Sequence, residues 1–226
     1  MSDGIRWIGE NAYKDANGGV PGMRGSISLT AARGVETEDF LVRLGADLEQ
    51  LDCQDLYKDR NDLALPSGGY KTHINWAMYG TCGDWLYVLE DWGMATFYAG
   101  YRSVAAMEPR TGEEIVCLTM NSWDPPQLIL HAPGDHNRTW QAEFGEPAGW
   151  SPTLDAALRA AGAVFPSAYY DSDTTEEEER QYFEEHHKQL PLAVFTGVGR
   201  YCGLTIDRAA VEAGLLPLAI LPMPES

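Results

Sequence analysis

Gly80-Thr-Cys-Gly-Asp-Trp-Leu-Tyr-Val-Leu-Glu-Asp-Trp-Gly93 is the stretch with the strongest strand pattern in the chain. Side chains of an extended strand alternate between its two faces, and both faces are largely apolar here, which predicts a strand in the interior of a sheet. The preceding residues 72–79 also alternate, and the short linker 80–83 predicts a hairpin with antiparallel strands. One face of the central strand would carry Trp85, Tyr87 and Leu89, and the other Leu86, Val88 and Glu90.

The remaining periodicity predicts an irregular order of strands and helices. Further strands are expected over residues 26–32, 115–120, 128–131 and 139–144. Helices are expected after Thr37, over residues 95–107, after Ser151-Pro152, after the capping box of Thr175 and Glu178, and from about 205 to 214. This order is not the regular alternation of a doubly wound sheet. It predicts an α+β fold, with a mainly antiparallel sheet of about five to six strands, helices on one face and a C-terminal helical segment.

The domain organisation expected from this order is one domain with three parts. Residues 1–25 would be an irregular lead segment, 26–150 the antiparallel α+β core, and 151–226 a C-terminal helical segment packed on that core. With 226 residues, 44% of them apolar, the chain is long enough to bury a substantial core.

Charge and cysteine usage exclude several functional classes. The formal net charge of −18 argues against direct nucleic-acid binding and against an anionic membrane surface, which both need clustered basic residues. The first residues show no basic region followed by an apolar run, and the apolar stretch 215–221 is too short to span a bilayer, so a cytoplasmic protein is expected. Four scattered cysteines without a Cys-x-x-Cys pair predict neither a disulfide framework nor structural zinc.

The acidity is concentrated in two segments. Residues 171–185 hold eight acids and one base, Arg180, and residues 36–62 hold nine acids and three bases. One interpretation is a solvated helix face with an alternating ladder of Glu176, Arg180, Glu184 and Lys188. The other is a single docking surface for a basic protein partner. Its predicted residues are Asp171, Asp173, Glu176, Glu177, Glu178, Glu179, Glu184, Glu185, Asp47, Glu49, Asp52 and Asp55.

Candidates for chemistry are fewer, and each has a structural alternative. His131, Asp135 and His136 could close on a metal ion. A hairpin turn at this position would explain Asp135 equally well. Glu90 could act as a general base in a pocket lined by Trp76, Trp85 and Trp92, or it could be a structural carboxylate at a strand end.

Two further patterns favour structure over ligand binding, and no cofactor is expected. The glycine run 197–203 has one residue too many for a dinucleotide-binding fingerprint and follows a helix pattern. His186 and His187 point about 100° apart on a helix. They are therefore expected to pair with Tyr182 and Phe183 and not to share an ion.

Several separated segments resemble an actinobacterial (Streptomyces-type) family known as a domain of unknown function. They are Arg33–Ala46, Gly83–Gly93, Ala193–Gly197 and Leu204–Asp207, and the resemblance spans most of the chain from Ser26 to Leu216. The resemblance implies a bacterial cytosolic origin. Because the family has no assigned activity, it implies no catalytic residue.

Two functional hypotheses follow. The first is a non-enzymatic acidic binding protein of the bacterial cytosol, such as an immunity, antitoxin-like or regulatory factor, that engages a basic protein through the acidic surface. An exposed aromatic residue would anchor the partner, from among Tyr169, Tyr170, Trp92 and Tyr98. The alternative is a small-ligand-binding protein or enzyme with the aromatic pocket near Glu90.

Overall fold

The computed structural model divides the chain into two compact units. The sheet unit comprises Lys14–Gln141 and Ile206–Ser226, and the helical unit comprises Met1–Tyr13 and Ala142–Thr205. Residues 206–226, which the sequence assigns to a C-terminal helical segment, thus cluster with the sheet. The structure describes residues 4–10, 27–48, 74–91, 97–98, 102–103, 108–119, 128–134, 139–149 and 151–222.

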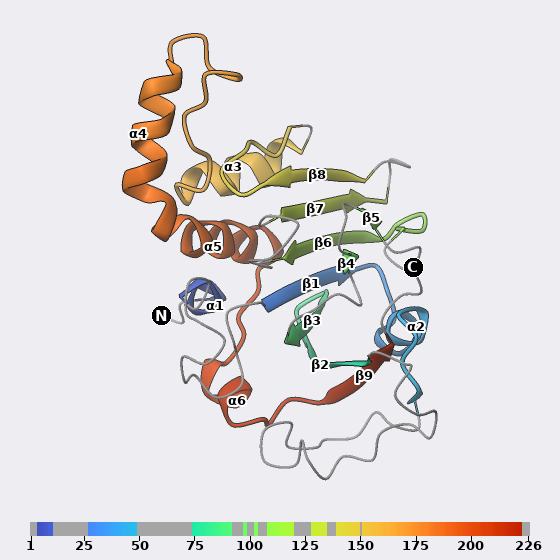
Figure 1. The fold of residues 1–226 in the computed structure, drawn as a ribbon. Coiled ribbons are helices and arrows are strands. Elements are labelled where there is room, and N and C mark those ends of the chain that lie inside the picture. The colour runs from blue at the N-terminus through green and yellow to red at the C-terminus, as the bar shows by residue number, and fades with distance from the viewer. Residues whose placement is uncertain are drawn as a thin grey trace. The chain divides into compact units, whose positions relative to one another are not determined.

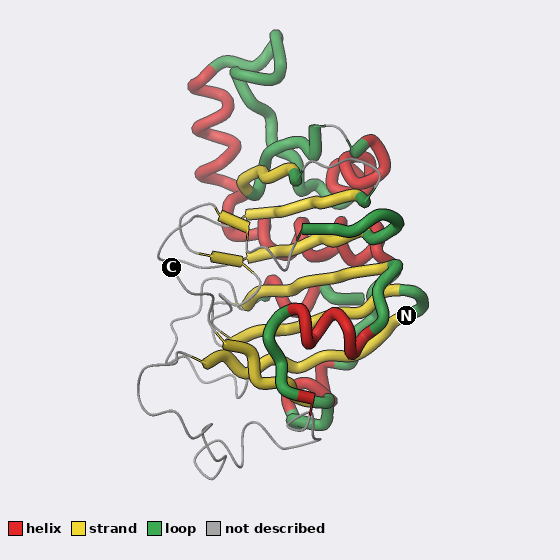
Figure 2. The backbone as a smooth tube through the Cα atoms, turned by 90° about the vertical axis from the view of Figure 1, so that its right-hand side faces the viewer, coloured by secondary structure: helices red, strands yellow, loops and turns green. Residues whose placement is uncertain are grey.

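A seven-stranded sheet carries the fold, with the strand order β8-β7-β6-β1-β3-β2-β9 (Figure 1 and Figure 2). The pairs β1–β3, β1–β6, β2–β3, β2–β9 and β6–β7 are antiparallel, which confirms the α+β fold with an antiparallel sheet. The strands are β1 (Ile27–Arg33), β2 (Ile74–Cys82), β3 (Trp85–Asp91), β6 (Glu114–Thr119), β7 (Leu128–Pro133), β8 (Trp140–Glu143) and β9 (Leu218–Pro222).

The predicted count of five to six strands is wrong because β9 was not foreseen. Prolines at both ends of this short apolar run suggested an irregular tail. Pro217 lies just before the strand, and its carbonyl accepts a hydrogen bond from the Tyr79 amide at 3.0 Å. β9 is also one of the two edge strands of this sheet, and an edge strand tolerates the missing amide of a proline such as Pro222.

The hairpin predicted around β3 is present, and β3 lies in the interior of the sheet between β1 and β2. The connection is shorter than the linker 80–83, because Cys82 already pairs with Trp85. Gly83 has a φ of 63°, the left-handed conformation that a two-residue hairpin turn needs.

The helix predicted over residues 95–107 is wrong for the described part of that range. Phe97–Tyr98 and Arg102–Ser103 form the strands β4 and β5 of a separate two-stranded sheet, in which Tyr98 pairs with Arg102. Neighbouring aromatic residues favour extended backbone, and Gly100 favours a turn over a continuing helix.

One face of the sheet is covered by α2 (Thr37–Arg43), which follows β1 after a sharp turn. Phe40 and Leu41 are buried in a cluster with Leu86 and Val88 of β3. The helix begins one residue earlier than predicted, with Glu36 at the N-cap position instead of Thr37. The short α6 (Arg208–Glu212) precedes β9, and its N-cap side chain, Asp207, accepts a hydrogen bond from the Ala209 amide.

The helical unit is built around α5 (Leu190–Cys202), with α1 (Arg6–Gly9) and α3 (Pro152–Ala160) in contact with it. A side chain at Gly197 would meet Leu158 of α3, and one at Gly199 would meet Ile5. These glycines therefore permit close helix packing, which explains the glycine run without a nucleotide. α4 (Glu176–His186) and the 3₁₀ turn η3 (His187–Gln189) lead into α5.

Candidate partner-binding site

The first turn of α4 is held by the predicted capping box. The Thr175 hydroxyl accepts a hydrogen bond from the Glu178 amide at 3.3 Å, and the Glu178 carboxylate accepts one from the Thr175 amide at 2.9 Å. These hydrogen bonds satisfy donors that have no partner within the helix. The backbone hydrogen bond from Thr175, and then its hydroxyl, lowers the pKa of Glu178 below its ordinary value of 4.5. The N-terminal turn of α4, which carries these glutamates, therefore has a fixed conformation.

Replacing Thr175 with alanine should lower the free energy of local unfolding of this first turn by about 1 kcal/mol, the usual contribution of an N-cap hydroxyl. Amide hydrogen exchange of residues 176–179 measures the effect. Thr174→Ala is the matched control, because the hydrogen bond that Thr174 makes to Asp171 comes from its backbone amide, which alanine keeps. The contribution of the ionised Glu178 is complete above pH 4.5 and is lost as the pH falls through its lowered pKa. Protection of residues 176–179 in the wild type that did not fall in acid would contradict the role of this carboxylate.

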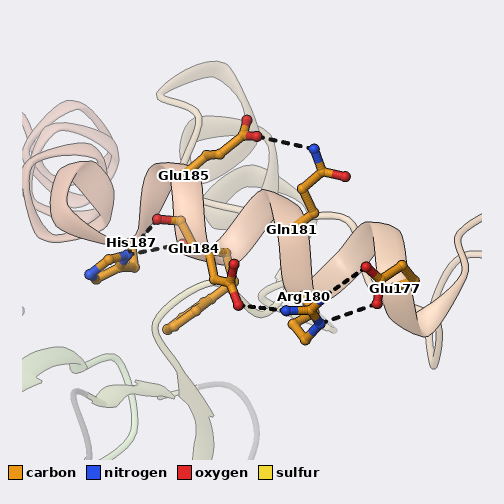
Figure 3. A network of polar contacts seen from close by, with 7 residues as sticks. Glu177, Arg180, Gln181, Glu184, Glu185 and His187 are labelled. Atoms are coloured by element: carbon orange, nitrogen blue, oxygen red, sulfur yellow. Dashed lines mark hydrogen bonds and ion pairs between the residues drawn. The ribbon is translucent and has the colours of Figure 1, made fainter.

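The exposed side of α4 carries an ion ladder, shown in Figure 3. Arg180 contacts Glu177 at 2.6 Å and Glu184 at 2.7 Å, and the hydrogen bond with Glu177 is the largest cause that raises the pKa of Arg180. The predicted ladder pairs Arg180 with Glu176, but in the structure Arg180 pairs with Glu177, the next residue in the chain. Such exposed pairs add little stability. Their effect is to neutralise the one base among the acids of α4.

Glu176 and Glu179 instead line a cleft of about 500 Å³ in the helical unit. Glu143 and Glu146, from the end of β8 and the turn after it, supply two more carboxylates. We call this site the acidic cleft; its described lining residues are Glu143, Phe144, Gly145, Glu146, Phe165, Pro166, Ser167, Tyr170, Glu176, Glu179, Arg180 and Phe183.

Backbone hydrogen bonds fix two of the glutamates in the acidic cleft. The Glu146 carboxylate accepts from the Glu143 amide at 2.9 Å, and the Glu179 carboxylate accepts from the Ala168 amide at 2.8 Å. The second contact ties the segment before α4 to the helix itself. The carboxylates are therefore arranged before any partner arrives, which reduces the entropy lost on binding.

Aromatic rings form the apolar part of the acidic cleft. Phe165 contacts Phe183 edge to face with 6.3 Å between ring centroids, and Tyr170 meets Tyr169 in the same way at 4.8 Å. Phe183 is 51% exposed, Tyr170 52% and Tyr169 86%. Desolvation, followed by the negative charge of Glu146, raises the pKa of Tyr170 above 10.0, so this tyrosine stays a neutral hydrogen-bonding group at neutral pH. Exposed rings beside fixed carboxylates suit an amphipathic cation, because arginine and lysine bind both aromatic faces and carboxylates.

The predicted acidic surface is only partly gathered in this cleft. Of the eight acids in residues 171–185, Glu176 and Glu179 line it, Glu177 and Glu184 pair with Arg180, and Glu178 caps the helix. Asp171, Asp173 and Glu185 accept local hydrogen bonds from Ser167, Ser172 and Gln181.

The second acidic segment belongs to the other unit. Asp47 is exposed in the sheet unit, while Glu49, Asp52 and Asp55 lie outside the described residues. A surface shared by both acidic segments stays a prediction. Of the four anchor candidates, Tyr169 and Tyr170 are exposed, and the side chains of Trp92 and Tyr98 lie outside the described part of the chain.

The structure does not bring Trp85 and Glu90 together. Both are buried in β3, but Glu90 shares a face with Leu86 and Val88, whereas Trp85 lies on the opposite face. Glu90 pairs across the sheet with Ser28 of β1. The side chain of Trp76 and the whole of Trp92 lie outside what the structure describes.

His131 is engaged by a neighbouring strand. Its Nε2 lies 2.8 Å from Glu114 of β6, whose other carboxylate oxygen accepts a hydrogen bond from Arg33 of β1 at 2.7 Å. Asp135 and His136, the other predicted metal ligands, are not among the described residues, and those that are contain no group of three or more potential ligands.

The two histidines at the end of α4 each stack on an aromatic ring, as predicted. His186 stacks on Tyr182 with 4.1 Å between ring centroids, and His187 on Phe183 with 5.4 Å. The Nδ1 of each histidine also donates to a backbone carbonyl of the preceding turn.

Sequence reasoning missed Glu143, Glu146 and Phe165 as members of the site. Glu143 and Glu146 belong to a segment that precedes α3. A bridge between Gly145 and Val164 and a 2.8 Å hydrogen bond from the Phe165 amide to the Gly145 carbonyl join that segment to the chain before α4. No local pattern signals such a contact.

Comparison of the chain with protein-family models, with curated proteins and with solved structures finds no match. None of the helices in the described ranges is long and apolar enough to cross a membrane. The geometry of the acidic cleft is therefore the basis on which a function can be inferred.

Proposed function

We propose that this chain is a non-enzymatic binding protein that engages a basic protein partner through the acidic cleft. The observation that carries the proposal is the meeting of four glutamates and four aromatic rings in one cleft, where Arg180 is already neutralised by Glu177 and Glu184. An arginine or lysine of the partner would enter between the carboxylates and lie against Phe183 or Tyr170.

The charge of the whole chain supports the same proposal. A net charge of −18 attracts cations from a distance and accelerates their association, and the cleft supplies local contacts that define an orientation. Acidic factors that neutralise or regulate a basic protein in the bacterial cytosol, as immunity and antitoxin-like proteins do, require both properties.

The test uses an oligoarginine peptide and a matched oligocitrulline peptide of equal length, because citrulline keeps the shape of arginine and loses its charge. Calorimetry with Glu143→Gln/Glu146→Gln/Glu176→Gln should show at least about tenfold weaker binding of oligoarginine, a loss of about 1.4 kcal/mol. Glutamine keeps a carbonyl oxygen for the local hydrogen bonds. Binding by wild type should also weaken with added salt.

The matched control carries the same charge change in the sheet unit, as Glu36→Gln/Glu38→Gln/Asp39→Asn, all at exposed positions. It should bind oligoarginine like wild type within about twofold. A second variant, Phe183→Ser, keeps every charge and should weaken binding as well, because it removes a ring of the cleft. Equal losses in the cleft and control triple variants would show that total charge alone attracts the peptide and would overturn the proposal.

A further inference from the structure

A second cleft in the helical unit has the opposite electrostatic character. Its volume is about 400 Å³, and it is lined by α1, the end of α3, the end of α4 and one side of α5. Arg6, Arg200 and His186 line it, and none of its described lining residues is an aspartate or a glutamate. The basic lining of this cleft is opposite in charge to the chain as a whole, which has 34 acids and 16 bases.

A stripe that starts at the last residue of η3 and continues along α5 lines this cleft. Gln189, Ala193, Thr196 and Arg200 follow one another at intervals of four, three and four residues, which places them on one side of the helix. Polar groups lie at both ends of the stripe and small side chains lie between them. The stripe thus leaves space for a ligand and offers hydrogen-bond donors beside it.

Two arginines, Arg6 and Arg200, supply basic groups to the lining of the cleft. Arg6, Thr196 and Arg200 also line an adjoining cleft of about 360 Å³, so these three residues form the boundary between the two spaces. Neither arginine is paired with a carboxylate of the described residues; Arg200 makes one long contact, 3.4 Å, to the Ala160 carbonyl. Two arginines without acidic partners provide several N–H donors to an oxyanion.

Aromatic rings also line the cleft. Tyr182 and Phe165 meet edge to face at 5.0 Å, and His186 stacks on Tyr182. The Nδ1 of His186 donates to the Tyr182 carbonyl at 2.9 Å, which leaves Nε2 as the ring nitrogen that a ligand can use. A planar ring can therefore pack against these aromatic side chains while its anionic group contacts the arginines.

We infer that this cleft binds a small organic anion, with a phosphate or carboxylate group between Arg6 and Arg200 and a planar ring against Phe165 and Tyr182. The volume lies in the range of small-molecule sites. This site is separate in charge and in ligand class from the acidic cleft, although Phe165 contributes to the walls of both.

The test measures binding of phenyl phosphate, benzoate, inorganic phosphate and benzyl alcohol to the full chain by NMR. Phenyl phosphate or benzoate should bind saturably with a Kd near or below about 1 mM and shift amide signals of residues 193–200. Inorganic phosphate and benzyl alcohol, each lacking one half of the ligand, should bind at least about tenfold more weakly. The ratio of phenyl phosphate to benzoate affinity identifies the anionic group.

Arg6→Gln/Arg200→Gln should weaken phenyl phosphate and benzoate binding by at least about tenfold. Arg159→Gln, an exposed arginine of α3 paired with Asp155 in the same unit, is the matched control and should bind like wild type. Unchanged far-ultraviolet circular dichroism would show that the double variant is folded. Equal binding by the double variant and wild type, or no saturable binding of either probe to wild type, would overturn the inference. Glu143→Gln/Glu146→Gln/Glu176→Gln should leave phenyl phosphate binding intact, so the two sites can fail separately.

Discussion

Replacing Gly34 with alanine is expected to lower the free energy of unfolding of the sheet unit by about 2–5 kcal/mol. Gly34 joins β1 to α2 with a φ of 70°, a left-handed conformation that costs alanine about 1–2 kcal/mol. The added methyl group would also collide with the Gly112 carbonyl oxygen of the turn before β6. Relief of that collision must move backbone, since the atom that is met has no flexible side chain, and overpacking of this kind adds about 1–3 kcal/mol.

Gly112→Ala separates these two causes. Gly112 also has a positive φ, 86°, but a methyl group there would meet no atom within 4 Å. Gly112→Ala should therefore lower the free energy of unfolding by only about 1–2 kcal/mol, which is the backbone strain of the left-handed conformation. Urea unfolding, followed by hydrogen exchange of the β1 and β6 amides, measures both variants. If the two alanines cost the same, the close approach of Gly34 to Gly112 does not contribute to the stability of the sheet.

The fold could be predicted best where the pattern is local. The alternation over residues 85–91 and the turn at Gly83 define β3 and its hairpin without reference to other parts of the chain. The proline at the start of α3 and the capping box of α4 act within one helical turn, and both were recognised. β9 was missed because its strand character depends on pairing with β2, about 140 residues earlier in the sequence.

The candidate site shows the same limit of local patterns. The glutamates of α4 are evident in the sequence, but their roles depend on which side of the helix meets another segment. Glu176 and Glu177 are neighbours, yet one lines the acidic cleft and the other pairs with Arg180. The contact of Glu114 with His131 likewise joins two strands, whereas the sequence suggested partners for His131 only among its near neighbours.

Replacing Glu114 with alanine is expected to lower the free energy of unfolding of the sheet unit by about 3 kcal/mol. Glu114 bridges Arg33 and His131 across three adjacent strands, and its side chain is 9% exposed. The Arg33 side chain is 46% exposed and can return to water when the carboxylate is removed. His131 is only 4% exposed, so it loses a hydrogen-bond partner that water cannot easily replace. Most of the expected loss therefore comes from the buried histidine.

A double-mutant cycle tests this origin. His131→Leu should cost about 1–2 kcal/mol, because Glu114 keeps its contact with Arg33, and leucine needs no hydrogen-bond partner. Glu114→Ala/His131→Leu should then be little less stable than Glu114→Ala, which gives a coupling energy of about 1–2 kcal/mol. Arg33→Gln, which removes the exposed partner, should cost less than about 1 kcal/mol. If the two losses simply add, the 2.8 Å contact between Glu114 and His131 does not stabilise the fold, and the burial of both groups must be explained by their packing alone.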